Sequence, residues 1–209
     1  MHVHVSMTRH PSAKTASTAV PVHPLLAERW SPRGFDREHE LDDVALAALL
    51  EAARWAPSSQ NSQPWRFLVS RRGEQAYDRL FATLAPGNRA WAGTASALVL
   101  VAARTVGDDG RPQSWALYDT GQAVAALVTQ AQADGLAVHQ MGGFDTTAVR
   151  AEFGVGGTLT PVVVLAIGRR DTAADLPEPL AVREAAPRTR RPVSDLLLPA
   201  GPELNRAAA

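Results

Sequence analysis

The chain has 209 residues, of which 45% are hydrophobic, and its 21 basic and 21 acidic side chains cancel to a formal net charge of zero. This length and apolar content are enough for one sizeable core, and a neutral chain has no net field to attract nucleic acid or an anionic membrane. Because cysteine is absent, disulfides, thiolate zinc sites, iron–sulfur clusters and a catalytic thiol are excluded.

The sequence predicts one domain between two short terminal segments. Residues 1–24 have no continuous apolar stretch, so we expect a flexible leader rather than a signal peptide. Residues 25–200 are expected to form a single domain that includes a C-terminal arm, and residues 201–209 a flexible tail. The longest apolar run, 95–103, is far shorter than the roughly 20 residues that cross a membrane as a helix. A cytoplasmic location is expected.

The first half of the domain predicts alternating helices and strands. Apolar residues at intervals of three and four predict a helix over 41–55, and a short strand over 66–70 follows. A second helix is predicted over 74–84 and is expected to stop at Pro86 and Gly87. The β-branched run 97–103 then predicts a buried strand.

The second half predicts a long buried helix over 115–134, because small and apolar residues cover most of its faces. A strand over 135–139, a helix over 146–153 and a central strand over 161–167 are expected to follow. Beyond the last strand the chain is rich in Pro, Glu and Arg, yet Leu196, Leu197 and Leu198 need burial. An extended arm lying on another surface, such as a second subunit, satisfies that need.

The segment "ERWSPRGFD" contains the first candidate site. Its Arg29, Ser31 and Arg33 have the donors of an anion clamp, since guanidinium groups match phosphate oxygens. The alternative is a solvated loop whose arginines pair with Glu28 or Asp36. These residues alone leave both interpretations open.

Two further segments are candidates. The turn "PSSQNSQ", residues 57–63, is rich in hydroxyls and amides that suit a neutral polar ligand, or that simply satisfy the end of a helix. In "GLAVHQMGGFD", the glycines allow the backbone to approach a flat ligand, or form an ordinary turn. A lone histidine here, His139, is more often structural. No metal site is expected, because the N-terminal histidines His2, His4 and His10 lie in the leader.

Taken together, "RWSPRGF", "APSSQNSQPWRF" and "GLAVHQMGGFD" resemble, in order, three motifs of the nitroreductase family of FMN-dependent oxidoreductases. The resemblance implies an α+β fold, a three-layer sandwich with a mixed, mainly antiparallel sheet flanked by helices. It also implies an intertwined homodimer with FMN at the subunit interface. The partners are then a small-molecule acceptor and a second copy of the chain, with no nucleic acid and no membrane.

The resemblance also implies which residues bind the cofactor. Arg29, Ser31 and Arg33 would hold the FMN phosphate and the pyrimidine edge. Either Arg188 or, preferably, Arg190 would reach the phosphate, with Arg169 and Arg170 as competitors. The remaining contacts would come from three places: the polar turn of the partner subunit, a polar side chain beside the flavin ring, and the glycine loop near N5. In that order, the residues are Pro57, Ser58, Ser59 and Asn61, then Asn88, then Met141, Gly142 and Gly143.

The activity implied is transfer of a hydride from NADH or NADPH, through flavin N5, to a nitroaromatic, quinone or enal in a ping-pong reaction. No catalytic side chain is required, because the flavin is the reactive centre and Arg33 supports its reduced form. Two alternatives stay open: a non-catalytic flavin-binding or regulatory protein, and a flavoenzyme of the same fold with other chemistry, namely dehydrogenation, dehalogenation or flavin destruction.

Overall fold

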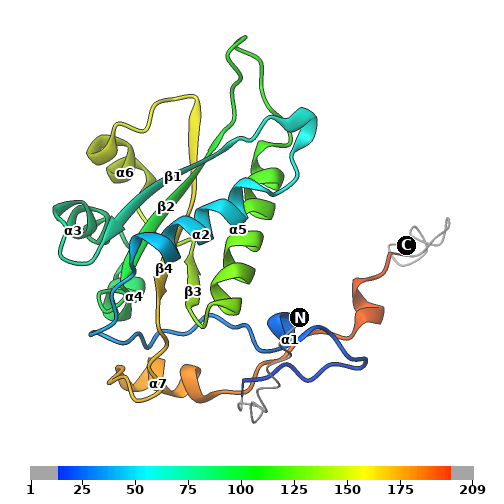
Figure 1. Ribbon diagram of the computed structural model, residues 1–209, viewed down its shortest axis with the longest axis vertical. Helices are drawn as coiled ribbons and strands as arrows, with labels where there is room; N and C mark the ends of the chain where they lie inside the picture. Colours follow the sequence, from blue (N-terminus) through cyan, green and yellow to red (C-terminus); the bar gives the residue numbers. More distant parts are fainter. Residues whose placement is uncertain (1–13, 199–209) are drawn as a thin grey trace, which may run out of the picture.

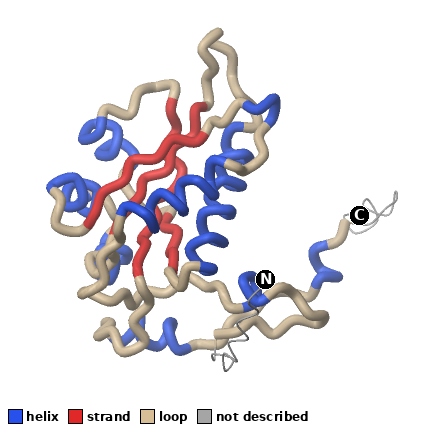
Figure 2. Tube along the Cα trace, in the orientation of Figure 1, coloured by secondary structure: helices blue, strands red, loops and turns tan. Residues whose placement is uncertain are grey.

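The computed structural model describes residues 14–198. The expected leader therefore lies partly outside the described residues, and the tail and the three N-terminal histidines lie wholly outside them. A four-stranded sheet with helices on both faces occupies the body of the molecule (Figures 1 and 2). No helix in the described part of the chain is long and apolar enough to cross a membrane.

The sheet has the strand order β1-β2-β4-β3, and every pairing in it is antiparallel. Its strands are β1 (Trp65–Arg71), β2 (Ala97–Arg104), β3 (Ala137–Met141) and β4 (Leu159–Gly168). Seven of the eight residues of β2 are buried, because this strand is covered on both faces and paired on both edges.

One face of the sheet is covered by α2 (Asp43–Arg54) and α5 (Ala116–Ala133), which pack on each other and on the strands. Asp42 begins α2, because its carboxylate accepts a hydrogen bond from the Ala45 N–H at 2.7 Å. Alternate residues of β2, Val99 and Val101, face this side and join the same core cluster.

The opposite face is covered by α3 (Gln75–Ala82), α4 (Pro86–Ala92) and α6 (Thr146–Phe153). Leu98 and Leu100, the other alternate residues of β2, belong to this second cluster. The two clusters make the domain a three-layer α+β sandwich, which confirms the predicted fold class, although every strand pairing in the described part of the chain is antiparallel and the sheet is not mixed.

A bridge attaches the N-terminal segment to the end of β4. Phe35 pairs antiparallel with Arg170, and the Asp36 N–H donates to the Arg169 carbonyl at 2.9 Å. Gly34 allows this approach, since a Cβ there would lie 2.4 Å from the carbonyl oxygen of Asp171. The bridge fixes the segment that carries the first candidate site.

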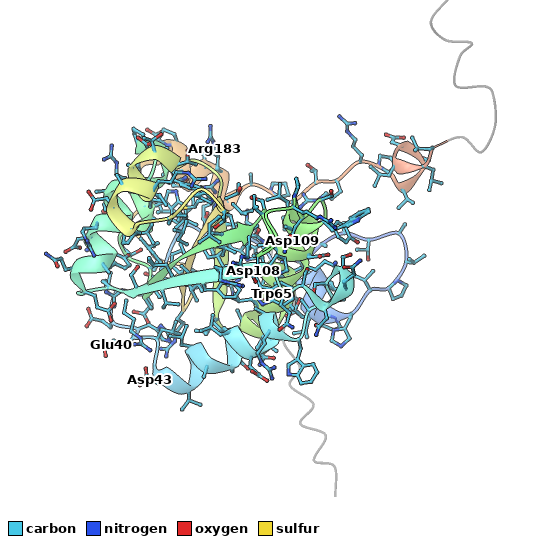
Figure 3. The ribbon with its side chains drawn as sticks, turned by 90° about the horizontal axis from the view of Figure 1, so that it is seen from above. Glu40, Asp43, Trp65, Asp108, Asp109 and Arg183 are labelled. Carbon is cyan, nitrogen blue, oxygen red and sulfur yellow. The ribbon has the colours of Figure 1, made fainter. Side chains whose placement is uncertain are left out.

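Beyond β4 the chain forms α7 (Glu178–Ala185), then an arm that ends in the 3₁₀ turn η2 (Val193–Leu196). Both Figure 1 and Figure 3 show η2 standing away from the body of the molecule. Leu196, Leu197 and Leu198 are 66%, 69% and 85% exposed. Their expected burial therefore does not occur within one chain.

Several elements differ from the sequence prediction. The helix predicted over 74–84 ends at Ala82, and Pro86 begins α4 instead of marking a stop, because proline suits the first turn of a helix. Helix α7 and the four-residue α1 (Pro24–Ala27) were not predicted. Neither has a buried residue from which an apolar stripe would be recognised.

Candidate functional site

Three arginines from the two ends of the domain gather beside α1. Arg188 donates to the backbone carbonyls of Ala27 at 2.7 Å and of Lys14 at 2.9 Å, which fixes the start of the arm next to Arg29. Burial and the charge of Arg190 lower the pKa of Arg29, and burial followed by the charges of Arg29 and Arg190 lowers the pKa of Arg188. The three guanidinium groups therefore repel one another, and a bound anion would relieve this repulsion.

Arg29 also reaches its sequence neighbour Ser31, whose hydroxyl oxygen lies 3.4 Å from Nη1. Asp36, one of the two carboxylates in the alternative interpretation, pairs with Arg169 at 3.6 Å and not with Arg29 or Arg33. The predicted Arg29, Ser31, Arg188 and Arg190 are thus brought together into one group, called the basic cluster below.

Arg33 differs from the basic cluster because a carboxylate accompanies it. Its backbone N–H donates to Glu184 Oε1 at 2.9 Å, and its Nη1 lies 3.4 Å from Oε2 of the same carboxylate. The two side chains are 23% and 18% exposed. Glu184 lies in the last turn of α7, so this ion pair attaches that helix to the N-terminal segment.

His139 lies on the sheet side of the same segment. Its Nδ1 is 2.8 Å from the carbonyl oxygen of Pro32, and its ring centroid is 4.4 Å from that of Trp91. A carbonyl only accepts, so Nδ1 carries the proton of this hydrogen bond. Burial is the main cause that lowers the pKa of His139, and the neighbouring Arg33 lowers it further. His139 therefore supports the segment structurally, as expected of a lone histidine.

The glycine loop follows β3 and is tied to the start of α4. Asn88 Nδ2 donates to the Gly143 carbonyl at 2.9 Å, and the Ala85 N–H donates to the same oxygen at 2.9 Å. A Cβ on Gly143 would lie 3.1 Å from Asn88 Nδ2, whereas one on Gly142 would meet no atom within 4 Å. The loop is therefore packed on one side and open on the other. Met141 is only 2% exposed, so the structure places this predicted site residue in the core and not on the open side of the loop.

The polar turn, residues 57–63, adopts an unusual backbone. Gln60, Asn61 and Gln63 all have positive φ angles, of 53°, 56° and 45°, a conformation that costs non-glycine residues energy and clusters at functional sites. Asp119 of α5, only 3% exposed, accepts a hydrogen bond from the Ser59 N–H at 2.9 Å. The Ser58 hydroxyl accepts from the Gln63 N–H at 3.0 Å. These hydrogen bonds fix the backbone of the turn, while most of its residues remain exposed to solvent.

The polar turn and the basic cluster lie at different ends of α5. The turn is tied to Asp119 in the first turn of α5, whereas α1 and α7 lie at the bottom of the view in Figure 1, near the other end of that helix. An 18-residue helix is about 27 Å long. The structure therefore brings the predicted residues into three groups, and a single chain does not join the polar turn to the other two.

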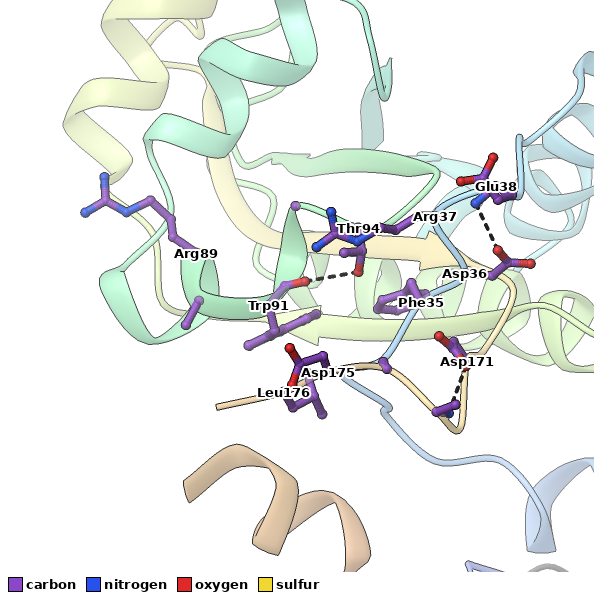
Figure 4. Close-up of a pocket in the computed structure, with 14 residues that line it drawn as sticks. Phe35, Asp36, Arg37, Glu38, Arg89, Trp91, Thr94, Asp171, Asp175 and Leu176 are labelled. Carbon is purple, nitrogen blue, oxygen red and sulfur yellow. Dashed lines mark hydrogen bonds between the residues drawn. The ribbon is translucent and has the colours of Figure 1, made fainter. Parts of the chain in front are cut away.

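A pocket of about 560 Å³ lies between α4, the segment after Gly34 and the chain beyond β4 (Figure 4). Phe35 and Trp91 form its apolar part, and charged residues such as Asp175 surround it. None of the predicted site residues lines it. A second pocket, of about 380 Å³, is bounded by the polar turn and by residues 107–116, including Trp115.

The fold and these groups define an α+β sandwich with a cluster of three arginines, a strained polar turn and a glycine loop that is open on one side. The family model described as "Nitroreductase family" matches residues 26–169, more than half of the chain. The chain belongs to the nitroreductase family, as the three motifs had indicated.

The chain is also similar to individual proteins. The chain is 41% identical over 133 residues to an uncharacterised 15.4 kDa protein of Mycolicibacterium smegmatis, covering 60% of this chain and 88% of that one. A match of 45 residues, 44% identical and covering 22% and 21% of the two chains, joins it to an oxygen-insensitive NADPH nitroreductase of Helicobacter pylori. A crystal structure of an oxidoreductase containing FMN superposes with a TM-score of 0.83 at 31% identity, over 93% of this chain and 98% of that one.

Two side chains that the sequence did not predict, Glu184 and Asp119, hold predicted site residues in place. Glu184 is 151 positions from Arg33, and Asp119 is 60 positions from Ser59. Asp119 gave one signal, an acidic residue inside an otherwise apolar helix. Glu184 gave none, since it lies in a stretch where charged residues are frequent.

Proposed function

We propose that this protein is an FMN-dependent oxidoreductase that uses NADH or NADPH to reduce a small organic acceptor, such as a nitroaromatic, quinone or enal, in a ping-pong reaction. When bound, FMN supplies the redox chemistry, because it accepts a hydride at N5 and passes reducing equivalents onward. The observation that carries the proposal is the basic cluster, three arginines with a serine beside them in a family whose relatives include an oxidoreductase containing FMN.

The donor groups fit this cofactor. The mutual repulsion within the basic cluster is relieved by a phosphate, and guanidinium groups bind its oxygens with paired hydrogen bonds. Arg33, partly neutralised by Glu184, suits a group that is uncharged or carries a single negative charge, such as the pyrimidine edge of the ring. The open side of Gly142 leaves room for the flat ring itself.

In this proposal each group of residues has one task. Arg29, Ser31, Arg188 and Arg190 bind the phosphate, while Asn88 holds the glycine loop against the ring through Gly143. Arg33 stabilises negative charge that develops at the pyrimidine edge. No side chain has to act as acid, base or nucleophile.

We further propose that a second copy of the chain completes the site. The polar turn is too far along α5 to join the basic cluster of its own chain, so Pro57, Ser58, Ser59 and Asn61 would contact the FMN of a partner subunit. Exposed apolar side chains on α5 and on the arm would be covered in that homodimer. They are Leu117, Tyr118, Val193, Leu196, Leu197 and Leu198.

The test is anaerobic reduction of the FMN-loaded protein. Bound FMN is prepared by gel filtration, NADH or NADPH is added separately, and the visible absorption is recorded. We expect one or both donors to bleach the flavin band, and addition of a quinone or nitroaromatic to restore it. Steady-state rates at several donor concentrations should then give parallel double-reciprocal lines.

Two results would change the assignment. Bound FMN that neither donor bleaches would favour the non-catalytic protein or a flavoenzyme with other chemistry. Absorption identical to that of free FMN after gel filtration, with all flavin in the small-molecule fraction, would remove the cofactor and the proposed activity together.

A further inference from the structure

Glu184 lies outside the three motifs, yet it makes a specific contact to Arg33, a proposed cofactor-binding residue. Its carboxylate receives two hydrogen bonds from Arg33, one from the backbone N–H at 2.9 Å and one from the guanidinium group at 3.4 Å. Both side chains are less than a quarter exposed. Partial burial weakens screening by solvent, so the two charges interact more strongly than an exposed surface pair.

The surroundings make this carboxylate the counter-charge of Arg33. In the basic cluster, Arg188 donates to the carbonyls of Lys14 and Ala27, Arg190 donates to the Thr189 carbonyl, and Arg29 donates to the Ser31 hydroxyl. Arg33 instead has the Glu184 carboxylate as its hydrogen-bonded ion-pair partner. A site that needed full positive charge at Arg33 would gain nothing from this arrangement.

We infer that Glu184 sets the reduction potential of bound FMN by partly neutralising Arg33. The inference rests on the proposed function, in which Arg33 lies beside the pyrimidine edge. Reduction increases the negative charge at that edge, so a free Arg33 would stabilise reduced FMN more than oxidised FMN. Glu184 lowers this preference, because its carboxylate opposes the field of the guanidinium group and competes for its hydrogen bonds. Glu184 is a positioning residue, since it acts through Arg33.

The test replaces Glu184 with glutamine, which keeps the size and an oxygen acceptor for the Arg33 N–H but removes the charge. The midpoint potential of bound FMN is measured by equilibration with reference dyes, together with the dissociation constant of oxidised FMN. We expect Glu184→Gln to raise the potential. A tenfold tighter binding of reduced relative to oxidised FMN would appear as a rise of about 30 mV for the two-electron couple.

The same helix provides a matched control. Glu178, at the first position of α7, is exposed and makes no ion pair or side-chain hydrogen bond with the described residues, so Glu178→Gln removes the same charge from the same helix. The two residues are six positions apart, which is about 9 Å along a helix, and screening at physiological ionic strength acts over about 8 Å. The potential of Glu178→Gln should equal that of the unaltered protein.

A second background tests whether the effect passes through Arg33. In Arg33→Ala, the additional change Glu184→Gln should move the potential by less than half as much as it does with Arg33 present. Glu184→Asp keeps the charge, and its potential should stay closer to that of the unaltered protein than the potential of Glu184→Gln. This variant provides the comparison if the glutamine variant fails to hold FMN.

Three results would overturn the inference: an unchanged potential in Glu184→Gln, an equal rise in Glu178→Gln, or an undiminished rise in the Arg33→Ala background. A purely structural Glu184 would give the first, with weaker binding of oxidised FMN and a lower free energy of unfolding but no shift in potential. Failure of the proposed function is recognised separately, because the unaltered protein would then hold no FMN, or would hold FMN that neither NADH nor NADPH bleaches.

Discussion

Arg190 is the member of the basic cluster whose role is easiest to test, because its guanidinium group donates to the carbonyl of its own neighbour, Thr189. Removing its side chain therefore leaves the fold intact. Arg188 is different, since its guanidinium group also joins Lys14 and Ala27. A change at Arg188 would alter both binding and structure.

We expect Arg190→Ala to weaken FMN binding about tenfold to a hundredfold, because a hydrogen bond to a charged group contributes about 1.5–3 kcal/mol. Riboflavin, which has no phosphate, should bind the variant and the unaltered protein equally. Fluorescence titration measures both. Arg191→Ala, one position further on and also exposed, is the control. Equal losses for FMN and riboflavin would show that Arg190 does not contact the phosphate.

His139 gives the protein a pH dependence. Burial lowers the pKa of His139 below its ordinary value of about 6.5, so folding favours the neutral ring. The associated stability is fully present above the unfolded pKa and declines as the pH falls below it. His139→Gln keeps a donor for the Pro32 carbonyl but cannot titrate.

The free energy of unfolding should therefore fall less between pH 7.5 and pH 5 in His139→Gln than in the unaltered protein. Urea titrations at the two pH values measure this difference. His39→Gln serves for comparison, because burial also lowers the pKa of His39. Identical pH dependence of His139→Gln and the unaltered protein would mean that His139 does not titrate as proposed.

At the scale of elements, α5 holds the polar turn through Asp119, a buried carboxylate. In Asp119→Ala the Ser59 N–H loses its acceptor, and we expect the free energy of unfolding to fall by about 1.5–3 kcal/mol. Amide hydrogen exchange should accelerate across residues 58–63 and FMN affinity should decrease. Asp119→Asn, which keeps an oxygen acceptor, should retain most of the protection.

Asp134→Asn is the matched control for this prediction, because Asp134 lies at the exposed end of the same helix. In Asp134→Asn, the amide hydrogens of the polar turn should exchange at the same rates as in the unaltered protein. Unchanged exchange in Asp119→Ala would contradict the proposed tether.

The glycine loop offers a comparison of two adjacent positions. Gly143→Ala would press a methyl group against Asn88 and Ala85, so we expect a loss of about 1–3 kcal/mol in the free energy of unfolding. Gly142→Ala meets no atom within 4 Å, and its stability without ligand should be unchanged. If the flavin ring occupies that open side, Gly142→Ala should nevertheless bind FMN less tightly. Equal FMN affinities of Gly142→Ala and the unaltered protein would place the ring elsewhere.

Sequence patterns predicted the elements whose ends have local signals. Helix α6 was predicted with its observed bounds, because Asp145 caps its start and Gly154, with φ 61°, ends it. Helix α4 was missed, since Pro86 can either stop one helix or begin the next. The partner of Arg33 could not be predicted either, because no local pattern connects two residues 151 positions apart.

At the scale of the whole molecule, the arm is the feature that one chain leaves unexplained. Leu196, Leu197 and Leu198 are mostly exposed at the end of a segment that stands away from the body. Burial of such side chains is worth about 25 cal/mol per Å² of apolar surface. A second copy of the chain would supply the covering surface.

We expect a homodimer in sedimentation velocity, and we expect the double substitution Leu196→Asp, Leu197→Asp to weaken both association and FMN binding. Val44→Asp, at an exposed apolar position on α2, controls for added charge and should leave the dimer intact. A monomeric unaltered protein that binds FMN fully would contradict the proposed sharing of the site.

The most direct test of the account is the stoichiometry of FMN binding. The purified protein is titrated with FMN, and the visible spectrum and the quenching of flavin fluorescence are followed to saturation. We expect one FMN per chain, because each chain contributes one basic cluster and one polar turn. No spectral change at any FMN concentration would contradict the central claim that these groups form a flavin site.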